Sequence, residues 1–303
     1  MQNGGPRRQA SPPRPSLMVG DLAQCRLAFE RLQRQCADLL QGTADRITWE
    51  DLVPRFRALR ESLLSNNAPL PFFTEALEAS SDTCLRAGSF PEFLKSVQQL
   101  VLVSYPALAA EDQIRTHLQS LRVSANGNSS SASPSARPSV PDDIRASMLQ
   151  RWPEFAGAFL LYFVCIPAVP ESMDLAALLR RLPHSLQRCP DVSYAVEAHR
   201  AMTQQGGLAF LQLHSRGTWM QQAIMLPRLQ QMQQRAVATF GSAYRTLSAE
   251  AALGLLCMRG ASTERLLALL KSCAEQGMLP AQRALSAAQM ADHHAQQLLV
   301  FHA

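Results

Sequence analysis

The amino-acid sequence predicts an all-α protein, a stack of helices that ends in a small compact unit. Apolar residues recur at the three- and four-residue spacing of amphipathic helices along most of the chain. Period-two runs typical of strands are almost absent before the last few residues. The 303 residues are enough for two domains, or for one extended helical array with a cap, at about 100 to 200 residues per domain.

The helix predicted from Trp49 shows this pattern clearly. Six of its apolar residues recur at the spacing of one helical stripe: Leu52, Val53, Phe56, Leu59, Leu63 and Leu64. Thr48 followed by Asp51 resembles a capping box at its start. Further helices are predicted at 21–41, 71–87, 91–103, 110–122, 142–150, 153–165, 172–182, 192–204, 208–214, 220–244, 248–258 and 263–276.

Two of the predicted turns look alike. Each consists of a helix, a glycine and a second helix that carries an aromatic residue, and they centre on Gly88 and Gly207. Helical-repeat proteins need a small residue at such a turn because the second helix folds back closely. The echo is therefore weak evidence for a solenoid of helical hairpins, which pack antiparallel when their turns are short.

The C-terminal segment has a different character. Its two predicted helices, 248–258 and 263–276, fit a helix-turn-helix or winged-helix unit. Residues 298–301 could form one edge of a small sheet. Helices of this kind equally form protein interfaces.

Two stretches without helical patterning divide the chain. Residues 1–20 contain four prolines and three arginines and no acidic residue, which predicts a disordered tail. Seven serines and three prolines fall within 124–141, which predicts a disordered insertion. The folded parts are then N-terminal helical hairpins at 21–123, C-terminal helical repeats at 142–247 and a winged-helix-like cap at 248–303.

The composition indicates a folded protein in a reducing compartment. Apolar residues make up 47% and charged residues 17%, and 29 basic residues against 24 acidic ones give a net charge of +5. The seven cysteines are an odd number without a closely spaced pair, which predicts buried thiols rather than disulfides or a zinc ribbon. No apolar run approaches the roughly 20 residues that a membrane span requires, so no membrane contact is expected.

No cluster of residues predicts an enzyme. The sequence lacks a glycine-rich phosphate loop, a His-Glu-x-x-His helix and a Gly-x-Ser-x-Gly elbow, so it predicts no catalytic site, no cofactor and no metal ion. One alternative stays open. Cys189 and His199, ten residues apart, could form a cysteine–histidine nucleophile on a helical scaffold.

The positive charge is concentrated in one segment. Residues 198–249 contain no acidic residue, where about four would be expected from the average of the chain. Arginine suits phosphate and carboxylate ligands because its planar fork donates two hydrogen bonds together. The candidate contacts for nucleic acid or for an acidic partner are the five arginines of this segment and two cations of the last predicted helix: Arg200, Arg216, Arg228, Arg235, Arg245, Arg265 and Lys271. The alternative is a solvated face, because glutamines surround Arg228 and Arg235.

The order of several motifs resembles a known family. The runs FRALRESL at 56–63, EALE at 75–78 and CLRAGSFPEF at 84–93 resemble an arginine-containing helix and the glycine turn after it in the GANP (germinal-centre-associated nuclear protein) family. The second half resembles it more closely, through PDVSYA at 190–195, Gly207, FLQLH at 210–214, RA at 235–236 and AYRTL at 243–247. The resemblance spans residues 48–279 and is nearest to the branch that contains leukocyte receptor cluster member eight.

This resemblance implies a fold and a function. The fold would be a PCI-like solenoid of helical hairpins, similar to tetratricopeptide repeats, that ends in a winged helix. The function would be that of a non-enzymatic scaffold in messenger-RNA processing, transcription coupling or export, in the nucleus and secondarily in the cytoplasm. Its partners would be a PCI-domain subunit and a small acidic protein of the Dss/Sem type, with RNA as a further candidate. The same helix order also fits PCI-type subunits of the proteasome lid, the signalosome or a translation-initiation complex.

Overall fold

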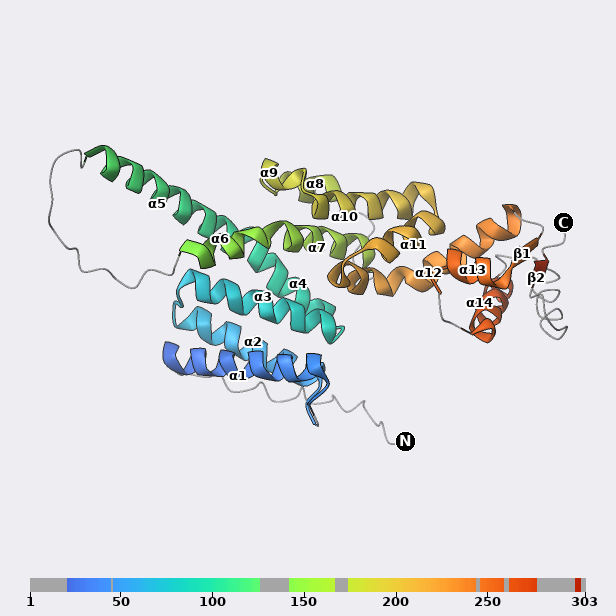
Figure 1. Cartoon of the computed structure of the whole chain (residues 1–303), viewed down its shortest axis with the longest axis horizontal. Coiled ribbons are helices and arrows are strands. Elements are labelled where there is room, and N and C mark those ends of the chain that lie inside the picture. The colour runs from blue at the N-terminus through green and yellow to red at the C-terminus, as the bar shows by residue number, and fades with distance from the viewer. Residues whose placement is uncertain are drawn as a thin grey trace, which may run out of the picture. The chain divides into compact units, whose positions relative to one another are not determined.

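The computed structural model describes residues 21–44, 46–125, 142–166, 174–243, 246–258, 262–276 and 298–300 (Figure 1). Helices dominate these residues, which confirms the predicted all-α class, and one pair of three-residue strands accompanies them. The predicted tail at 1–20 and residues 126–141 of the predicted insertion lie outside the described residues. The chain forms two compact units, residues 1–93 and 94–303. This division falls within α4 and not at the serine-rich segment, because α5 before that segment contacts α6 after it.

The first unit contains three full helices and the start of a fourth. They are α1 (Leu22–Gln41), α2 (Trp49–Ser65), α3 (Leu70–Arg86) and the first turn of α4 (Phe90–Gln99). The predicted stripe of α2 is confirmed for Leu52, Phe56, Leu59 and Leu63, which are buried. Val53 at its edge is half-buried, and Leu64 is 52% exposed. The capping box is confirmed as well: the backbone N–H of Thr48 donates to Asp51 Oδ2 at 3.0 Å.

A shielded ion pair joins α2 to the start of α4. Arg60 Nη2 lies 2.8 Å from Glu92 Oε2, and the two side chains are 9% and 14% exposed. Arg57 and Glu61 form a second pair at 3.0 Å, with side chains nearly half exposed. The removal of one partner from the shielded pair would leave a poorly solvated charge, whereas an exposed pair contributes little to stability.

The second unit contains the remaining elements. They are the π-helical turn η1 (Leu100–Ser104), α5 (Tyr105–Ala125), α6 (Asp142–Gln150), α7 (Trp152–Cys165), α8 (Leu175–Arg180), α9 (His184–Gln187), α10 (Pro190–Arg200), the π-helical turn η2 (Ala201–Gln205), α11 (Gly207–Arg216), α12 (Trp219–Ala243), β1 (Thr246–Ser248), α13 (Ala249–Leu255), α14 (Thr263–Glu275) and β2 (Leu298–Val300).

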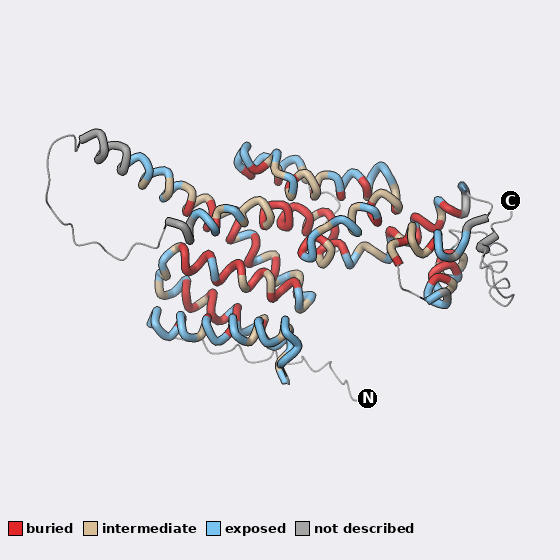
Figure 2. Tube along the Cα trace, in the orientation of Figure 1, coloured by how far each residue is buried: buried red, intermediate tan, exposed pale blue. Residues whose placement is uncertain are grey.

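Helix α7 is the centre of this unit. Ten of its 14 residues are buried, from Phe155 to Cys165, and Figure 2 shows it as a nearly continuous buried segment. A helix that is apolar on every side must be covered on every side. Both α10 and α12 contact α7. A Cβ on Gly157 would lie 2.5 Å from the backbone oxygen of Asp191, so α7 and α10 approach closely at this glycine.

The two helices predicted at 91–103 and 110–122 are joined into one continuous helical segment. Helix α4 runs through η1 directly into α5, without the predicted break. Pro106 lies in the first turn of α5, just after the π-helical turn. A proline has no backbone N–H and clashes with the carbonyl four residues earlier, and a wider turn is one way in which a helix accommodates it.

The glycine turn at Gly207 brings α11 against the backbone of α12. Gly206 has φ of 83°, in the left-handed region. A Cβ on Gly207 would overlap the backbone oxygen of Met232 and lie 2.6 Å from the backbone nitrogen of Ala236. The small residue is therefore required here by α12, which follows the turn, and not by a fold-back of α11 on the helix before it, as the sequence predicted. At Gly88 only the positive φ of 65° calls for glycine, because an added Cβ would meet nothing within 4 Å.

The C-terminal elements follow the predicted order. Strand β1, which was not predicted, pairs antiparallel with β2, with Leu247 opposite Leu299. This confirms the strand predicted at 298–301 for residues 298–300, and Phe301 lies outside the described residues. Helix α14 contacts α12, and its Leu266, Leu270 and Cys273 are buried. The residues between α14 and β2 lie outside the described ranges, so the winged helix stays a prediction.

The Gly207 contact generates a stability prediction. We expect Gly207→Ala to lower the free energy of unfolding by about 2 kcal/mol or more, because backbone atoms of α12 would have to move away from the new methyl group. Gly254→Ala in α13 is the matched control, because its Cβ would meet nothing within 4 Å. Alanine favours a helix over glycine by up to about 1 kcal/mol, so the control is neutral or stabilising. Urea unfolding measures both, and equal effects would contradict the close contact.

Candidate partner-binding groove

The structure separates the seven predicted cations into distinct groups. Two of them, Arg228 and Arg235, bind carbonyl groups at the ends of other helical segments. Two more, Arg200 and Arg216, line a surface groove. The remaining cations lie nearer the C-terminus: Arg265 and Lys271 are exposed on α14, and Arg245 lies outside the described residues.

Arg228 anchors the C-terminal end of α7. Its Nε donates to the backbone oxygen of Cys165 at 3.1 Å, and its Nη1 donates to Gln231 Oε1 at 3.0 Å. A positive charge is favourable at this end of a helix, where carbonyl groups lack helical partners. The side chain is half-buried, so its first role is to hold α7 against α12.

Arg235 binds the turn that leads into the groove. Its Nη1 donates to the backbone oxygen of Met202 at 3.0 Å, within η2. The two arginines therefore do not form the common ligand-binding face that their spacing of seven residues suggests. The glutamines between them also divide: Gln233 donates to the backbone oxygen of Leu256, and Gln234 is buried and donates to Ser272 Oγ.

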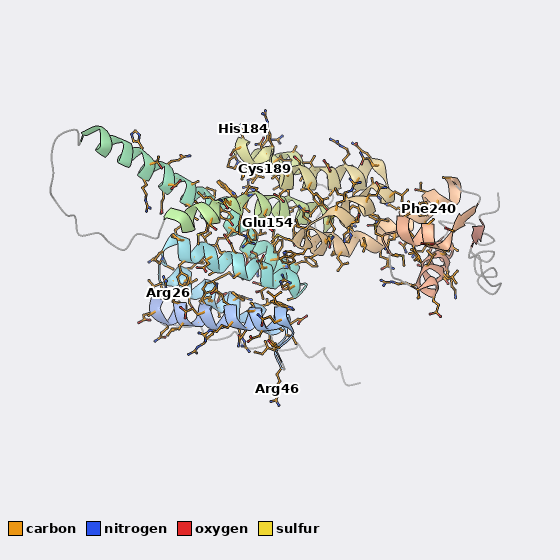
Figure 3. All side chains as sticks on the ribbon, viewed as in Figure 1. Arg26, Arg46, Glu154, His184, Cys189 and Phe240 are labelled. Atoms are coloured by element: carbon orange, nitrogen blue, oxygen red, sulfur yellow. The ribbon has the colours of Figure 1, made fainter. Side chains whose placement is uncertain are left out.

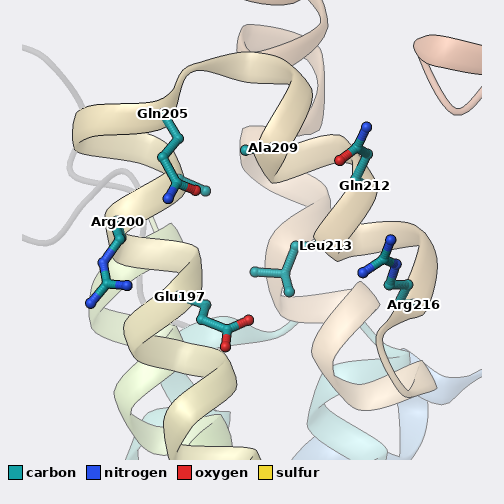
Figure 4. Close-up of a pocket in the computed structure, with 8 residues that line it drawn as sticks. Glu197, Arg200, Gln205, Ala209, Gln212, Leu213 and Arg216 are labelled. Atoms are coloured by element: carbon teal, nitrogen blue, oxygen red, sulfur yellow. The ribbon is translucent and has the colours of Figure 1, made fainter.

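The groove lies between α10 with η2 on one side and α11 on the other (Figure 4). Its volume is about 260 Å³. Small and apolar side chains form part of its lining, and five exposed polar side chains complete it. The lining residues are Glu197, Arg200, Ala201, Gln205, Ala209, Gln212, Leu213 and Arg216.

The charged groups of the groove are available to a ligand. Among the residues that the structure describes, no side-chain hydrogen bond or ion pair involves Arg200, Arg216 or Glu197. Figure 4 shows the Glu197 carboxylate directed toward α11, between the two arginines. An unpaired guanidinium retains its full set of donors for a carboxylate or phosphate.

A half-buried tyrosine fixes the two walls relative to each other. Tyr194 on α10 donates its hydroxyl to the backbone oxygen of Leu213 on α11 at 2.9 Å, and the hydroxyl oxygen lies 3.2 Å from Met225 Sδ. Burial raises the pKa of Tyr194 and lowers the pKa of the neighbouring His214, so both side chains are neutral near pH 7. A Cβ on Gly217 would lie 2.5 Å from the tyrosine hydroxyl. The walls of the groove are therefore two helices packed against each other, and not a loop.

Polar contacts also fix the start of α12. The backbone N–H of Thr218 donates to Gln221 Oε1 at 2.9 Å, and that of Gln221 lies 3.4 Å from Thr218 Oγ1. Gln221 Nε2 in turn donates to Asp191 Oδ1 at 3.3 Å, in the first turn of α10. This reciprocal capping box has the sequence signature Thr-x-x-Gln, although it was not among the predicted caps.

Three groove residues were also not predicted, namely Glu197, Gln205 and Gln212. Glu197 is the last acidic residue before the acid-free segment, so a count of charges along the chain excludes it. Its spacing of three residues from Arg200 was the available signal, because residues three apart share a helical face.

The proposed cysteine–histidine pair is wrong. Cys189 caps the start of α10, where Figure 3 labels it, and His199 lies at the other end of the same helix. At 1.5 Å per residue, ten residues of helix separate them by about 15 Å, far beyond hydrogen-bond reach. The Cys189 thiol instead donates to the backbone oxygen of Ser185 at 3.4 Å.

The comparisons with known proteins place the chain in no family. No family model matches the sequence, and neither a curated protein nor a solved structure shows significant similarity to it. Within the described ranges, no helix combines the length and the apolar character that a membrane crossing requires.

The different roles of the arginines generate a second prediction. We expect Arg228→Gln to lower the free energy of unfolding by about 1 to 2 kcal/mol, because a charge-assisted bond to the end of α7 is lost. Arg235→Gln acts in the same direction and costs less, because that side chain is exposed. Arg200→Gln and Arg216→Gln should each cost no more than about 0.5 kcal/mol, because only a solvent-screened interaction with a helix end is lost. Thermal unfolding of the four variants compares them, and equal losses at all four positions would contradict the distinction.

Proposed function

We propose that the protein is a non-enzymatic helical scaffold that binds an acidic segment of a partner protein in the groove between α10 and α11. The observation that carries this proposal is the pair of exposed, unpaired arginines on a hairpin fixed by internal contacts. A rigid hairpin fixes the backbone positions from which both arginine side chains extend, so no backbone entropy has to be lost there on binding.

Charge supports an acidic partner. The groove contains two positive charges and one negative charge. All of its lining residues except Glu197 belong to the segment of 52 residues that has no acidic residue. Such a local field attracts acidic segments and raises their rate of association. The contact is therefore expected to weaken as salt is added.

The cysteines support a role without nucleophilic chemistry. Burial raises the pKa of Cys84 to about 11, of Cys165 to about 12 and of Cys273 to about 11. A thiol is a nucleophile only after it loses its proton, so these three are poor nucleophiles near pH 7. A scaffold fits these thiols better than a cysteine hydrolase.

The resemblance to the GANP family supports a more specific role. Both walls of the groove and the whole of α12 lie in the part of the sequence that resembles that family best, residues 190–247. We accordingly propose a PCI-type scaffold in nuclear messenger-RNA processing, transcription coupling or export. Its partners would be a PCI-domain subunit and a small acidic Dss/Sem-type protein, and RNA contact would be secondary.

Affinity purification of the tagged full chain tests this function. We expect recovery of a PCI-domain subunit of the RNA-processing type together with a small acidic protein. The Arg200→Gln, Arg216→Gln double variant should lose most of the acidic protein. Arg181→Gln is the matched control, because Arg181 is exposed at the end of α8 and does not line the groove. Recovery of proteasome-lid subunits without an RNA-processing partner would refute the nuclear role, and retention of the acidic protein by the double variant would refute the groove.

A further inference from the structure

The groove contains a carboxylate that would repel a ligand whose charged groups are all negative. Glu197 lies on α10 one turn before Arg200 and lines the same groove as both arginines. A glutamate three residues from an arginine on a helix can pair with it. No ion pair joins Glu197 to Arg200 in the described structure, so this carboxylate faces the groove unneutralised.

We propose that Glu197 selects the ligand: the groove binds an acidic protein segment that carries a basic side chain between its acidic ones. The inference rests on the proposed function of the groove and specifies its partner. In this arrangement Arg200 and Arg216 receive carboxylates of the ligand, and Glu197 receives a lysine or arginine between them. The three charges of the groove then meet three charges of the opposite sign.

Charge complementarity favours this ligand over a nucleic acid. A single strand presents phosphates at regular intervals and carries no cation, so Glu197 would repel the strand where the two arginines attract it. Like charges placed across an interface are a common way to exclude the wrong partner. Gln205 and Gln212 extend the polar lining with amide groups, which donate and accept and so tolerate a peptide backbone.

The aliphatic part of the lining fits a basic side chain as well. Leu213 and Ala209 are half-buried on α11, opposite the helix that carries Glu197. Figure 4 shows Leu213 extending toward the Glu197 carboxylate. A lysine lays its methylene chain on apolar surface while its ammonium group stays with a polar partner. One ligand side chain can therefore use both the apolar lining and the carboxylate.

Fluorescence anisotropy on the full chain tests the inference with three labelled probes. The first is a short Asp- and Glu-rich peptide with one central lysine, the second is the same peptide with glutamine in place of lysine, and the third is a short oligouridylate. All titrations share one ionic strength, because salt screens exposed charges. Glu250→Gln is the matched control for Glu197→Gln, because Glu250 is exposed in α13 and does not line the groove.

We expect wild type to bind the lysine peptide about three- to fivefold more tightly than the glutamine peptide, the upper range for an exposed ion pair. Glu197→Gln should abolish this preference and bind the glutamine peptide and oligouridylate more tightly than wild type does. Glu250→Gln should behave like wild type.

Three other outcomes would each overturn the inference, and they separate it from the proposed function. If lysine brings no advantage while Arg200→Gln and Arg216→Gln weaken both peptides, the acidic-partner groove stands and the role of Glu197 falls. If wild type binds oligouridylate more tightly than either peptide, the groove is a nucleic-acid site. If neither peptide binds in a manner that depends on the two arginines, the proposed function falls together with the inference.

Discussion

The second unit depends on one helix, α12, and on how closely its neighbours approach it. At Gly207 the backbone of α11 meets the backbone of α12 without room for a methyl group. The same helix holds the end of α7 through Arg228 and η2 through Arg235. Between these two arginines, Gln233 binds the backbone oxygen of Leu256 at the end of α13, and Gln234 binds Ser272 in α14. Each bond is modest, yet with the bond from Gln221 to Asp191 in α10 they connect α12 to both walls of the groove.

This arrangement explains why similar side chains have different functions. Arg228 and Arg235 each donate a hydrogen bond to a carbonyl near the end of a helix. Such a carbonyl has no partner within its own helix, so the bond satisfies both groups and makes that guanidinium less available to a ligand. Among the described residues, the side chains of Arg200 and Arg216 donate to no carbonyl group and line the groove instead. Their charges therefore remain directed at the surroundings of the protein. The local charge excess thus divides in two: α12 uses Arg228 and Arg235 for internal contacts, and the hairpin keeps Arg200 and Arg216 exposed, where we propose that they bind a partner.

The sequence predicted what depends on neighbours along the chain. The all-α class, the buried face of α2 and the Thr48 capping box all follow from spacings of a few residues, and so they were predictable. The need for a small residue at Gly207 was predictable from the turn, but its cause was not, because the backbone that excludes a Cβ there belongs to α12 and not to the helix before the turn. The strand at 298–300 followed from its apolar run.

The partners of the arginines could not be predicted in the same way. Arg228 and Cys165 are 63 residues apart, and Arg235 and Met202 are 33 residues apart. Only the fold brings these residues together. From charge and spacing alone, all five arginines of the acid-free segment were equally good candidates for contact with a ligand. Glu197 was not predicted because charge was counted along the chain, while the groove is organised by helical faces and by a second helix across from them.

Hydrogen-exchange mass spectrometry of the full chain, with and without the lysine-containing acidic peptide, tests the central claim most directly. If the hairpin of α10, η2 and α11 is the binding site, the peptide slows amide exchange in residues 197–216 and leaves α14 unchanged. Slower exchange around Arg265 and Lys271 on α14, with no change in residues 197–216, would contradict the account.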